Sequence, residues 1–296
     1  MKKTEPGACT SAVRAPAKKA YVQYETQFDY AAATEGLRIC LPTQNGYINY
    51  DLVHSVKESI SADLWRIGRA FTCDGRLETL TPITTPSAEW DMAIRLEGRD
   101  DSIGGYAHGD EAYVSFTLFV DGKETAPSAL SEPTPFTALH MVQDSIGYDP
   151  NDHVSRVLLH HKEWTVTAEG ITLCQRIEWL NAYTVKKAYL AMMPPMKAYT
   201  DHYCTDLTPT SVPCNLEEQH SVTIPNSKRA VVHGERLYFE MAVPRYPEMP
   251  GGNCFLLTDN GGAPYNKMYF RMGCGNFSVE RGDIWETETV YRIEHR

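Results

Sequence analysis

Apolar and polar residues alternate with a period of two through most of the chain from residue 21 onward. In residues 90–96 every second residue, from Trp90 to Leu96, is apolar, and residues 113–120 repeat the alternation. Alternation of this kind predicts half-buried β-strands. Further predicted strands cover 21–30, 37–41, 47–56, 64–72, 136–142, 156–166, 171–179, 184–192, 221–224, 230–232, 237–243, 255–257, 267–274 and 285–293.

Turn-forming pairs separate these strands, among them Asp121-Gly122 and Glu169-Gly170. No segment keeps a helical period, because Pro194-Pro195 interrupts the nearest candidate, 185–199. Many short strands with polar turns predict an all-β protein. We expect a single antiparallel β-sandwich domain over 20–296, jelly-roll-like, that follows a disordered tail over 1–19. The longest irregular stretch is expected at 193–217.

The net charge and the apolar content limit the classes of partner that the protein can bind. The net charge of −10 argues against nucleic acid, and an anionic ligand would need a local basic patch. No apolar run reaches the roughly 18 residues that a membrane helix needs, so no membrane partner is expected. Lys2 and Lys3 are not followed by the apolar segment of a signal peptide. Both a cytoplasmic location and secretion after removal of a signal stay open.

The eight cysteines are widely spaced and form no C-x-x-C motif, which argues against a zinc ribbon. We expect mostly buried thiols, with a disulfide between Cys204 and Cys214 as the alternative. No metal ligand set and no cofactor are identified. A cupin-type metal site needs an H-x-H pair, and the loop at 104–111 contains one histidine.

This glycine-containing loop, between two predicted strands, is the leading candidate site. His108 can act as a general base, and Tyr106 can give or take a proton. Asp110 and Glu111 could orient His108 or bind a cation, and both are expected to contact a substrate. The alternative is a surface turn with polar decoration.

His160 and His161 are neighbours in a predicted strand, so only one of them can face a site. His161 is the one expected to contact a substrate. The alternative is one hydrogen-bonded histidine on each face of the sheet.

Several strands set an apolar row against a row of charged and aromatic residues. In 267–274, Lys267, Tyr269 and Arg271 share the polar row, and Arg95 lies on the polar side of 90–96 with Arg99 beyond it. Such a row is either a solvated face or a sugar-binding groove. A tyrosine with a cation suits β-elimination on a uronic acid, because the cation neutralises the carboxylate while a tyrosine or histidine moves the proton.

The segment Tyr269-Phe270-Arg271-Met272-Gly273 resembles the Y-F-K-x-G motif of jelly-roll alginate lyases, and Arg95-Leu96-Glu97 resembles their R-x-E-L strand. The resemblance implies an all-β fold and cleavage of uronate polymers by elimination. Gly275 stands where that family has a catalytic tyrosine, and no Q-I-H segment occurs. The base would therefore come from elsewhere, with His108 as the candidate.

The sequence lacks the signatures of several other enzyme classes, because it contains no G-x-S-x-G elbow, Walker A motif or Rossmann fingerprint. The leading hypothesis is a polysaccharide lyase that acts on an acidic polysaccharide or oligosaccharide. Its expected catalytic residues are His108, Tyr106, Tyr269, Arg271 and Arg95, and its substrate-binding residues are Glu111, Asp110, Arg99, Lys267 and His161. A glycoside hydrolase on the same groove and a non-catalytic glycan-binding or structural module are the alternatives. Converging histidine, tyrosine and arginine would favour the lyase.

Overall fold

The computed structural model describes residues 18–29, 33–73, 80–86, 90–104, 108–214, 221–259 and 262–296. Strands dominate these residues. The helical elements among them are the 3-10 turns η1 (Glu58–Ile60), η2 (Pro127–Ala129) and η3 (Lys197–Tyr199). None of the helices found there has the length and apolar character that a membrane crossing requires. The predicted all-β class is confirmed, and most of the predicted tail lies outside the described residues.

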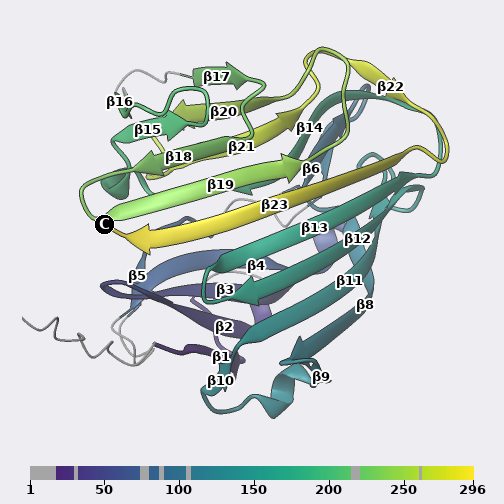
Figure 1. Ribbon diagram of the computed structural model, residues 1–296. Coiled ribbons are helices and arrows are strands. Elements are labelled where there is room, and N and C mark those ends of the chain that lie inside the picture. The colour runs from purple at the N-terminus through teal and green to yellow at the C-terminus, as the bar shows by residue number, and fades with distance from the viewer. Residues whose placement is uncertain are drawn as a thin grey trace, which may run out of the picture.

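The larger sheet is a curved, almost entirely antiparallel array (Figure 1). Along its path lie β10 (Thr134–Phe136), β1 (Ala20–Glu25), β2 (Ala33–Thr43), β3 (Gly46–Lys57), β4 (Ala62–Cys73), β8 (Glu111–Val120), β11 (Ala138–Tyr148), β12 (Arg156–Thr167), β13 (Gly170–Trp179), β23 (Ile284–His295), β19 (Leu237–Arg245), β18 (Arg229–His233), β15 (His202–Thr205) and β16 (Val212–Pro213). Two short strands flank this path, β5 (Leu80–Pro82) on β4 and β9 (Lys123–Glu124) on β8.

The smaller sheet packs against the larger one and completes the predicted sandwich. Its order is β17 (Ser221–Pro225), β20 (Cys254–Asp259), β21 (Asn266–Met272), β14 (Tyr183–Met193), β6 (Ala93–Leu96) and β7 (Ser102–Ile103), and β22 (Phe277–Val279) also pairs with β14. In Figure 1 its strands β14, β20 and β21 lie behind β19 at the top of the molecule.

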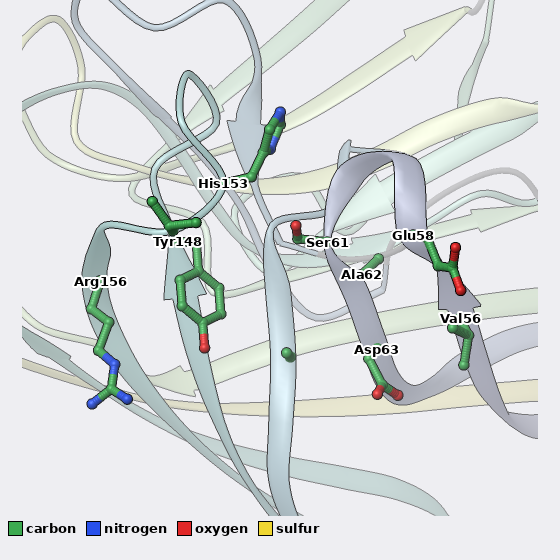
Figure 2. A pocket seen from close by; sticks show the side chains of 10 residues that line it. Val56, Glu58, Ser61, Ala62, Asp63, Tyr148, His153 and Arg156 are labelled. Atoms are coloured by element: carbon green, nitrogen blue, oxygen red, sulfur yellow. The ribbon is translucent and has the colours of Figure 1, made fainter.

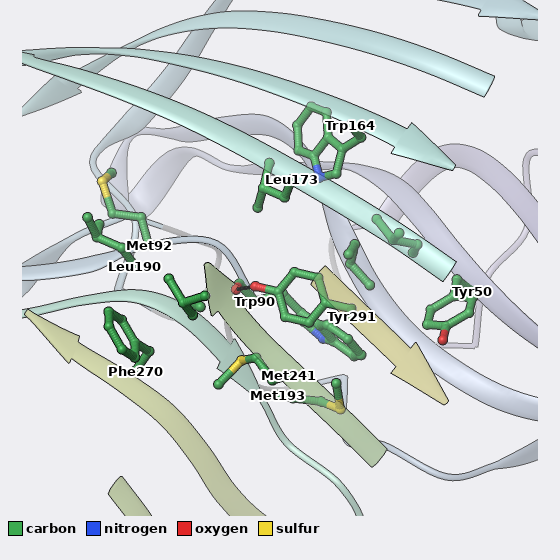
Figure 3. Close-up of a cluster of buried hydrophobic side chains, with 14 of the residues drawn as sticks. Tyr50, Trp90, Met92, Trp164, Leu173, Leu190, Met193, Met241, Phe270 and Tyr291 are labelled. Carbon is green, nitrogen blue, oxygen red and sulfur yellow. Dashed lines mark hydrogen bonds between the residues drawn. The ribbon is translucent and has the colours of Figure 1, made fainter. Parts of the chain in front are cut away.

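The apolar rows of the sequence form the core between the layers. Along β13 buried and partly exposed residues alternate without a break, as a strand with one buried face requires. Figure 3 shows the centre of this core, where Trp90, Trp164 and Phe270 meet residues of both sheets. The Tyr291 hydroxyl, on β23, donates a hydrogen bond to the Trp90 carbonyl, which joins segments distant in the sequence.

Three expectations about strands need correction. The stretch 193–217 contains η3, β15 and β16, which are too short to show a period. Val114 belongs to an apolar row but is 66% exposed, because a register shift between β8 and β11 leaves it as the extra, unpaired residue of a bulge. The first strand ends at Glu25 rather than at residue 30.

The cysteines within the described residues form no disulfide, so the Cys204–Cys214 alternative is not found. Cys40, Cys73 and Cys254 are buried, whereas Cys274 is exposed. The expectation of mostly buried thiols therefore holds for only part of the set.

Candidate active site

The candidate site is a cleft at the seam between β4 and β8. These two strands run parallel and share one residue pair, Asp63 with Ala112, in an otherwise antiparallel sheet. The residues around this pair, on the hairpin after β3 and on the turn before β12, line an opening. The cleft has a volume of about 690 Å³, which suits a sugar-sized ligand. It is lined by Val56, Glu58, Ser61, Ala62, Asp63, Ala112, Tyr148, His153, Val154 and Arg156.

An aspartate–histidine pair forms one end of the cleft. His153 Nδ1 lies 2.5 Å from Asp110 Oδ1, and the side chains are 43% and 2% exposed respectively. The buried carboxylate thus fixes the ring and its tautomer, with Nδ1 donating and Nε2 left for a ligand. His153 Nε2 makes no hydrogen bond to any residue that the structure describes.

The backbone at this pair is strained. Asp110 and His153 have φ angles of 59° and 60°, in the left-handed region that non-glycine residues rarely occupy. Two backbone hydrogen bonds hold Asp110 in this conformation. Its N–H donates to the Ile60 carbonyl at 2.6 Å, and its carbonyl accepts from the backbone N–H of Tyr148 at 2.7 Å. Strain maintained by surrounding structure is concentrated at functional sites.

The groups around His153 and Asp110 change the pKa values of both side chains. The hydrogen bond from its ring to Asp110 raises the pKa of His153 above its usual value of 6.5. Burial raises the pKa of Asp110, and this effect outweighs the opposing hydrogen bond and charge of His153. His153 is therefore a stronger base than a free imidazole.

A second histidine supports the opposite wall. His54 Nε2 lies 2.7 Å from Asp63 Oδ1, and its Nδ1 lies 3.3 Å from Glu35 Oε1. Tyr24 donates its hydroxyl to Glu35 at 2.5 Å, so a hydrogen-bonded chain crosses four strands from the cleft. The His54 ring stacks on Trp65 at 5.4 Å, which fixes its plane.

Figure 2 shows how the chemical groups are distributed around the opening. The Tyr148 phenol and the Arg156 guanidinium extend on one side, and the carboxylates of Asp63 and Glu58 lie on the other. His153 lies at the end between the two sides, with its ring directed away from Tyr148. The cleft thus contains a base, a phenol, a cation and two carboxylates.

The predicted loop contributes to this cleft differently from expectation. His108 is 37% exposed and its Nδ1 lies 2.7 Å from Asp101, so Asp101 rather than Asp110 orients it. Asp110 orients His153 instead. Tyr106 lies outside the described residues. Gly109 has a φ of 84° and approaches the Ile60 backbone, where a Cβ would lie 2.5 Å from the carbonyl oxygen.

Glu111 does not reach the cleft, which corrects its expected role in substrate binding. Its side chain is fully buried, and Oε1 accepts from Lys162 at 3.1 Å, His160 at 2.9 Å and Ser145 at 2.6 Å. Lys162 also contacts Asp91 Oδ2 at 2.7 Å. Asp91, Glu111, His160 and Lys162 form what we call the buried quartet. Its position explains why Asp110, one residue earlier, faces the opposite way.

Hydrogen bonds link the buried quartet to β13. The Gln175 amide nitrogen donates to the Leu190 carbonyl at 2.7 Å, so its oxygen faces His160 Nε2 at 3.0 Å. Both ring nitrogens of His160 therefore lie within hydrogen-bond distance of an acceptor, Glu111 Oε1 and Gln175 Oε1.

The buried quartet also shifts the pKa values of its members. Burial would raise the pKa of Glu111, but Lys162 and His160 outweigh it and lower this pKa below its usual value. Burial would lower the pKa of Lys162, and the attraction of Asp91 and Glu111 outweighs that effect and raises it.

Arg99 supports the cleft from behind rather than lining it. Its guanidinium pairs with Asp149 Oδ2 at 2.7 Å. The Asp149 carbonyl accepts the His153 N–H at 2.7 Å, so Arg99 steadies the turn that carries His153.

His160 and His161 face opposite sides of β12, as expected. His161 lies on the outer face between Asp144 at 2.8 Å and Glu163 at 3.0 Å. Both contacts raise its pKa against the opposing effect of burial. His161 does not line the cleft.

The smaller sheet brings the remaining predicted residues together. Arg95 on β6 and Lys267, Tyr269 and Arg271 on β21 lie on its outer face, opposite the buried Met268, Phe270 and Met272. This face does not include His108 or the cleft residues, so the structure splits the predicted catalytic set.

Sequence reasoning missed His153, Tyr148 and Arg156. A weak signal existed, because Asp149-Pro150-Asn151-Asp152 is a turn sequence that joins two long predicted strands and places His153 at a loop. The parallel pair of β4 with β8 at the cleft has no sequence signal.

Comparisons with known proteins match the chain by shape alone. No protein-family model and no curated protein matches the sequence. Among solved structures, the Slr1438 protein from Synechocystis sp. PCC 6803 matches with a TM-score of 0.46 and 10% identity, covering 91% of this chain and 100% of that one. A putative aldose 1-epimerase from Escherichia coli K12 matches with a TM-score of 0.43 and 11% identity, covering 88% and 99%.

The GH36 alpha-galactosidase AgaB from Geobacillus stearothermophilus matches with a TM-score of 0.46 and 9% identity over 88% of this chain. The chain spans 40% of the length of that enzyme.

Proposed function

We propose that this protein is a carbohydrate-active enzyme, a polysaccharide lyase that cleaves a uronate-containing glycan by β-elimination in the cleft between β4 and β8. The observation that carries the proposal is the strained Asp110–His153 pair at an open cleft that Tyr148 and Arg156 also line. Histidine, tyrosine and arginine around one opening are the groups that elimination needs.

Each residue has a defined role in the proposed reaction. Arg156 pairs with the uronate carboxylate, which acidifies the proton on the adjacent carbon. His153 Nε2 removes this proton, and its electron pair forms a carbon–carbon double bond as the glycosidic carbon–oxygen bond breaks. Tyr148 donates its hydroxyl proton to the leaving oxygen, after which the tyrosinate takes a proton from water and His153 releases its own proton to water. Asp110 stabilises the imidazolium that forms in the first step.

The test follows the ultraviolet absorbance of the unsaturated product with a panel of acidic polysaccharides. We expect His153→Ala to lower the rate by roughly 100- to 10,000-fold, the usual contribution of a general base. His140→Ala, which removes an exposed histidine on the outer face of β11, serves as the matched control and should keep the wild-type rate. If His108→Ala loses activity and His153→Ala keeps it, His108 in the predicted loop would be the base instead of His153.

A glycoside hydrolase is the second candidate, because Glu58 and Asp63 place two carboxylates on the same cleft. A reducing-sugar assay without absorbance by an unsaturated product would favour it, and Asp63→Asn should then abolish the activity. Binding without either product would indicate a non-catalytic glycan-binding module.

A further inference from the structure

A cluster of cations and aromatic rings lies on the outer face of the smaller sheet, away from the cleft. Cross-strand register places Arg95 opposite Lys187, and Tyr189 opposite Arg271. We call this cluster the basic face. It consists of Arg95, Lys187, Tyr189, Lys267, Tyr269 and Arg271.

No carboxylate among the described residues neutralises the cations of the basic face. Within the described part of the chain, Arg95, Lys187, Lys267 and Arg271 make no ion pair. Their cross-strand partners include Ser102, Tyr189, Cys254 and Thr258, and none of these partners is acidic. Glu97, which directly follows β6, accepts a hydrogen bond from Asn276 at 3.3 Å.

This arrangement is costly without a ligand. Like charges directly opposite each other, such as Arg95 and Lys187, destabilise a sheet. Arg271 is half-buried, and its Nε is buried without a hydrogen-bond partner among the described residues. These four cations, which make no ion pair within the described residues, also gather on one face of a protein with a net charge of −10. An anionic ligand would remove both costs and would explain why the cations lie together.

The aromatic rings narrow the class of ligand. Tyr189 and Tyr269 contact each other edge to face, with ring centroids 5.1 Å apart, and the Lys267 ammonium lies 5.8 Å from the Tyr269 ring centroid. Aromatic rings offer flat apolar surfaces with a polar tip, which suit the faces of sugar rings. Cations interleaved with tyrosines therefore fit a chain that repeats both sugar faces and anionic groups.

We propose that the basic face is a second binding surface, at which the protein holds an acidic polysaccharide outside the catalytic cleft. The sugar class rests on the proposed function, whereas the site itself rests on the charges and rings of the smaller sheet. Two sites on one chain raise the local concentration of polymer at the cleft.

The experiment measures binding of the full chain to polygalacturonate by titration calorimetry, with neutral dextran and duplex DNA as comparison ligands. We expect binding to polygalacturonate that weakens with salt, and no binding to dextran. Arg95→Gln/Arg271→Gln should weaken binding by about tenfold or more, since charge-assisted hydrogen bonds contribute this much. Lys123→Gln/Arg281→Gln removes the same charge at exposed positions elsewhere and should change binding less than about twofold.

A second variant tests the same surface in case the double mutant does not fold. Lys187 is exposed, so Lys187→Gln should fold normally and still weaken binding. The inference is overturned by equal losses in the test and control variants, by equal binding of dextran, or by tighter binding of DNA than of polygalacturonate.

The inference and the proposed function fail separately. If polygalacturonate binds at the basic face, but neither it nor any other acidic polymer is cleaved, the proposed lyase activity is refuted and the proposed binding surface is not. Cleavage with unchanged binding by Arg95→Gln/Arg271→Gln overturns this surface alone. His153→Ala should abolish cleavage and keep this binding.

Discussion

Replacing Lys162 by methionine tests the charge balance of the buried quartet. The Lys162 ammonium is fully buried and contacts carboxylate oxygens of Asp91 and Glu111 at 2.7 and 3.1 Å. Methionine fills a similar volume, so the substitution removes the charge with little change in packing. Removing one partner of a buried ion pair costs about 3–5 kcal/mol, because the other partner stays buried without compensation.

The structure places the expected loss near the middle of that range. Without Lys162, Glu111 keeps its hydrogen bonds from His160 and Ser145, but Asp91 Oδ2 loses the ammonium contact. Asp91 Oδ1 already has no hydrogen-bond partner among the described residues. We therefore expect the free energy of unfolding to fall by about 4 kcal/mol at pH 7. The matched variant Glu111→Gln keeps the pair of Lys162 with Asp91 and should lose about 2 kcal/mol.

Urea unfolding followed by tryptophan fluorescence measures both variants. The pKa of Glu111 is lower in the folded protein than its usual 4.5, so its ionised form stabilises the fold above that pH, and this stabilisation is lost as the pH falls. Lys162→Met removes a major cause of the lowered pKa. The difference between wild type and Lys162→Met should therefore shrink from pH 7 to pH 4. A loss below about 1 kcal/mol at pH 7, or a difference that does not shrink in acid, would refute the charge balance.

Two further predictions concern the cleft. Asp110→Asn replaces the charged acceptor of the His153 ring by a neutral amide oxygen, so an NMR titration should show the pKa of His153 moving down towards 6.5, and an unchanged value would contradict the pairing. Because the wild-type pKa is raised, the Asp110–His153 contact stabilises the fold below pH 6.5, and this effect is lost as the pH rises through the higher folded value. Gly109→Ala should destabilise by roughly 2–4 kcal/mol, because its Cβ would clash with the Ile60 backbone. Gly98→Ala has a similar positive φ of 71° but open space around its Cβ, and thermal unfolding should show a loss of only about 1 kcal/mol.

Much of the fold follows from local sequence because strand alternation is a local property. The alternation in residues 171–179 predicted β13, and even its one polar inward residue, Gln175, has a reason in the structure, since it hydrogen-bonds His160. The short strands β15 and β16 escaped prediction because a period of two cannot be recognised over a few residues.

The site was less accessible to prediction because it depends on contacts between distant segments. Asp110 and Glu111 are adjacent in sequence but belong to different environments, which register and burial decide. The partner of Asp110 lies 43 residues away. The grouping of Arg95 with Arg271 likewise required knowing that β6 and β21 both pair with β14.

The central position of β23 has a consequence for biosynthesis. This strand lies between β13 and β19, and its Tyr291 reaches Trp90 in the core. On the ribosome it emerges after every other strand of the two sheets. Until then β13 and β19 expose unpaired edges, and nascent chains on one message could pair through them. Synthesis of this protein should therefore depend on chaperones that shield strand edges until residues 284–295 have left the exit tunnel.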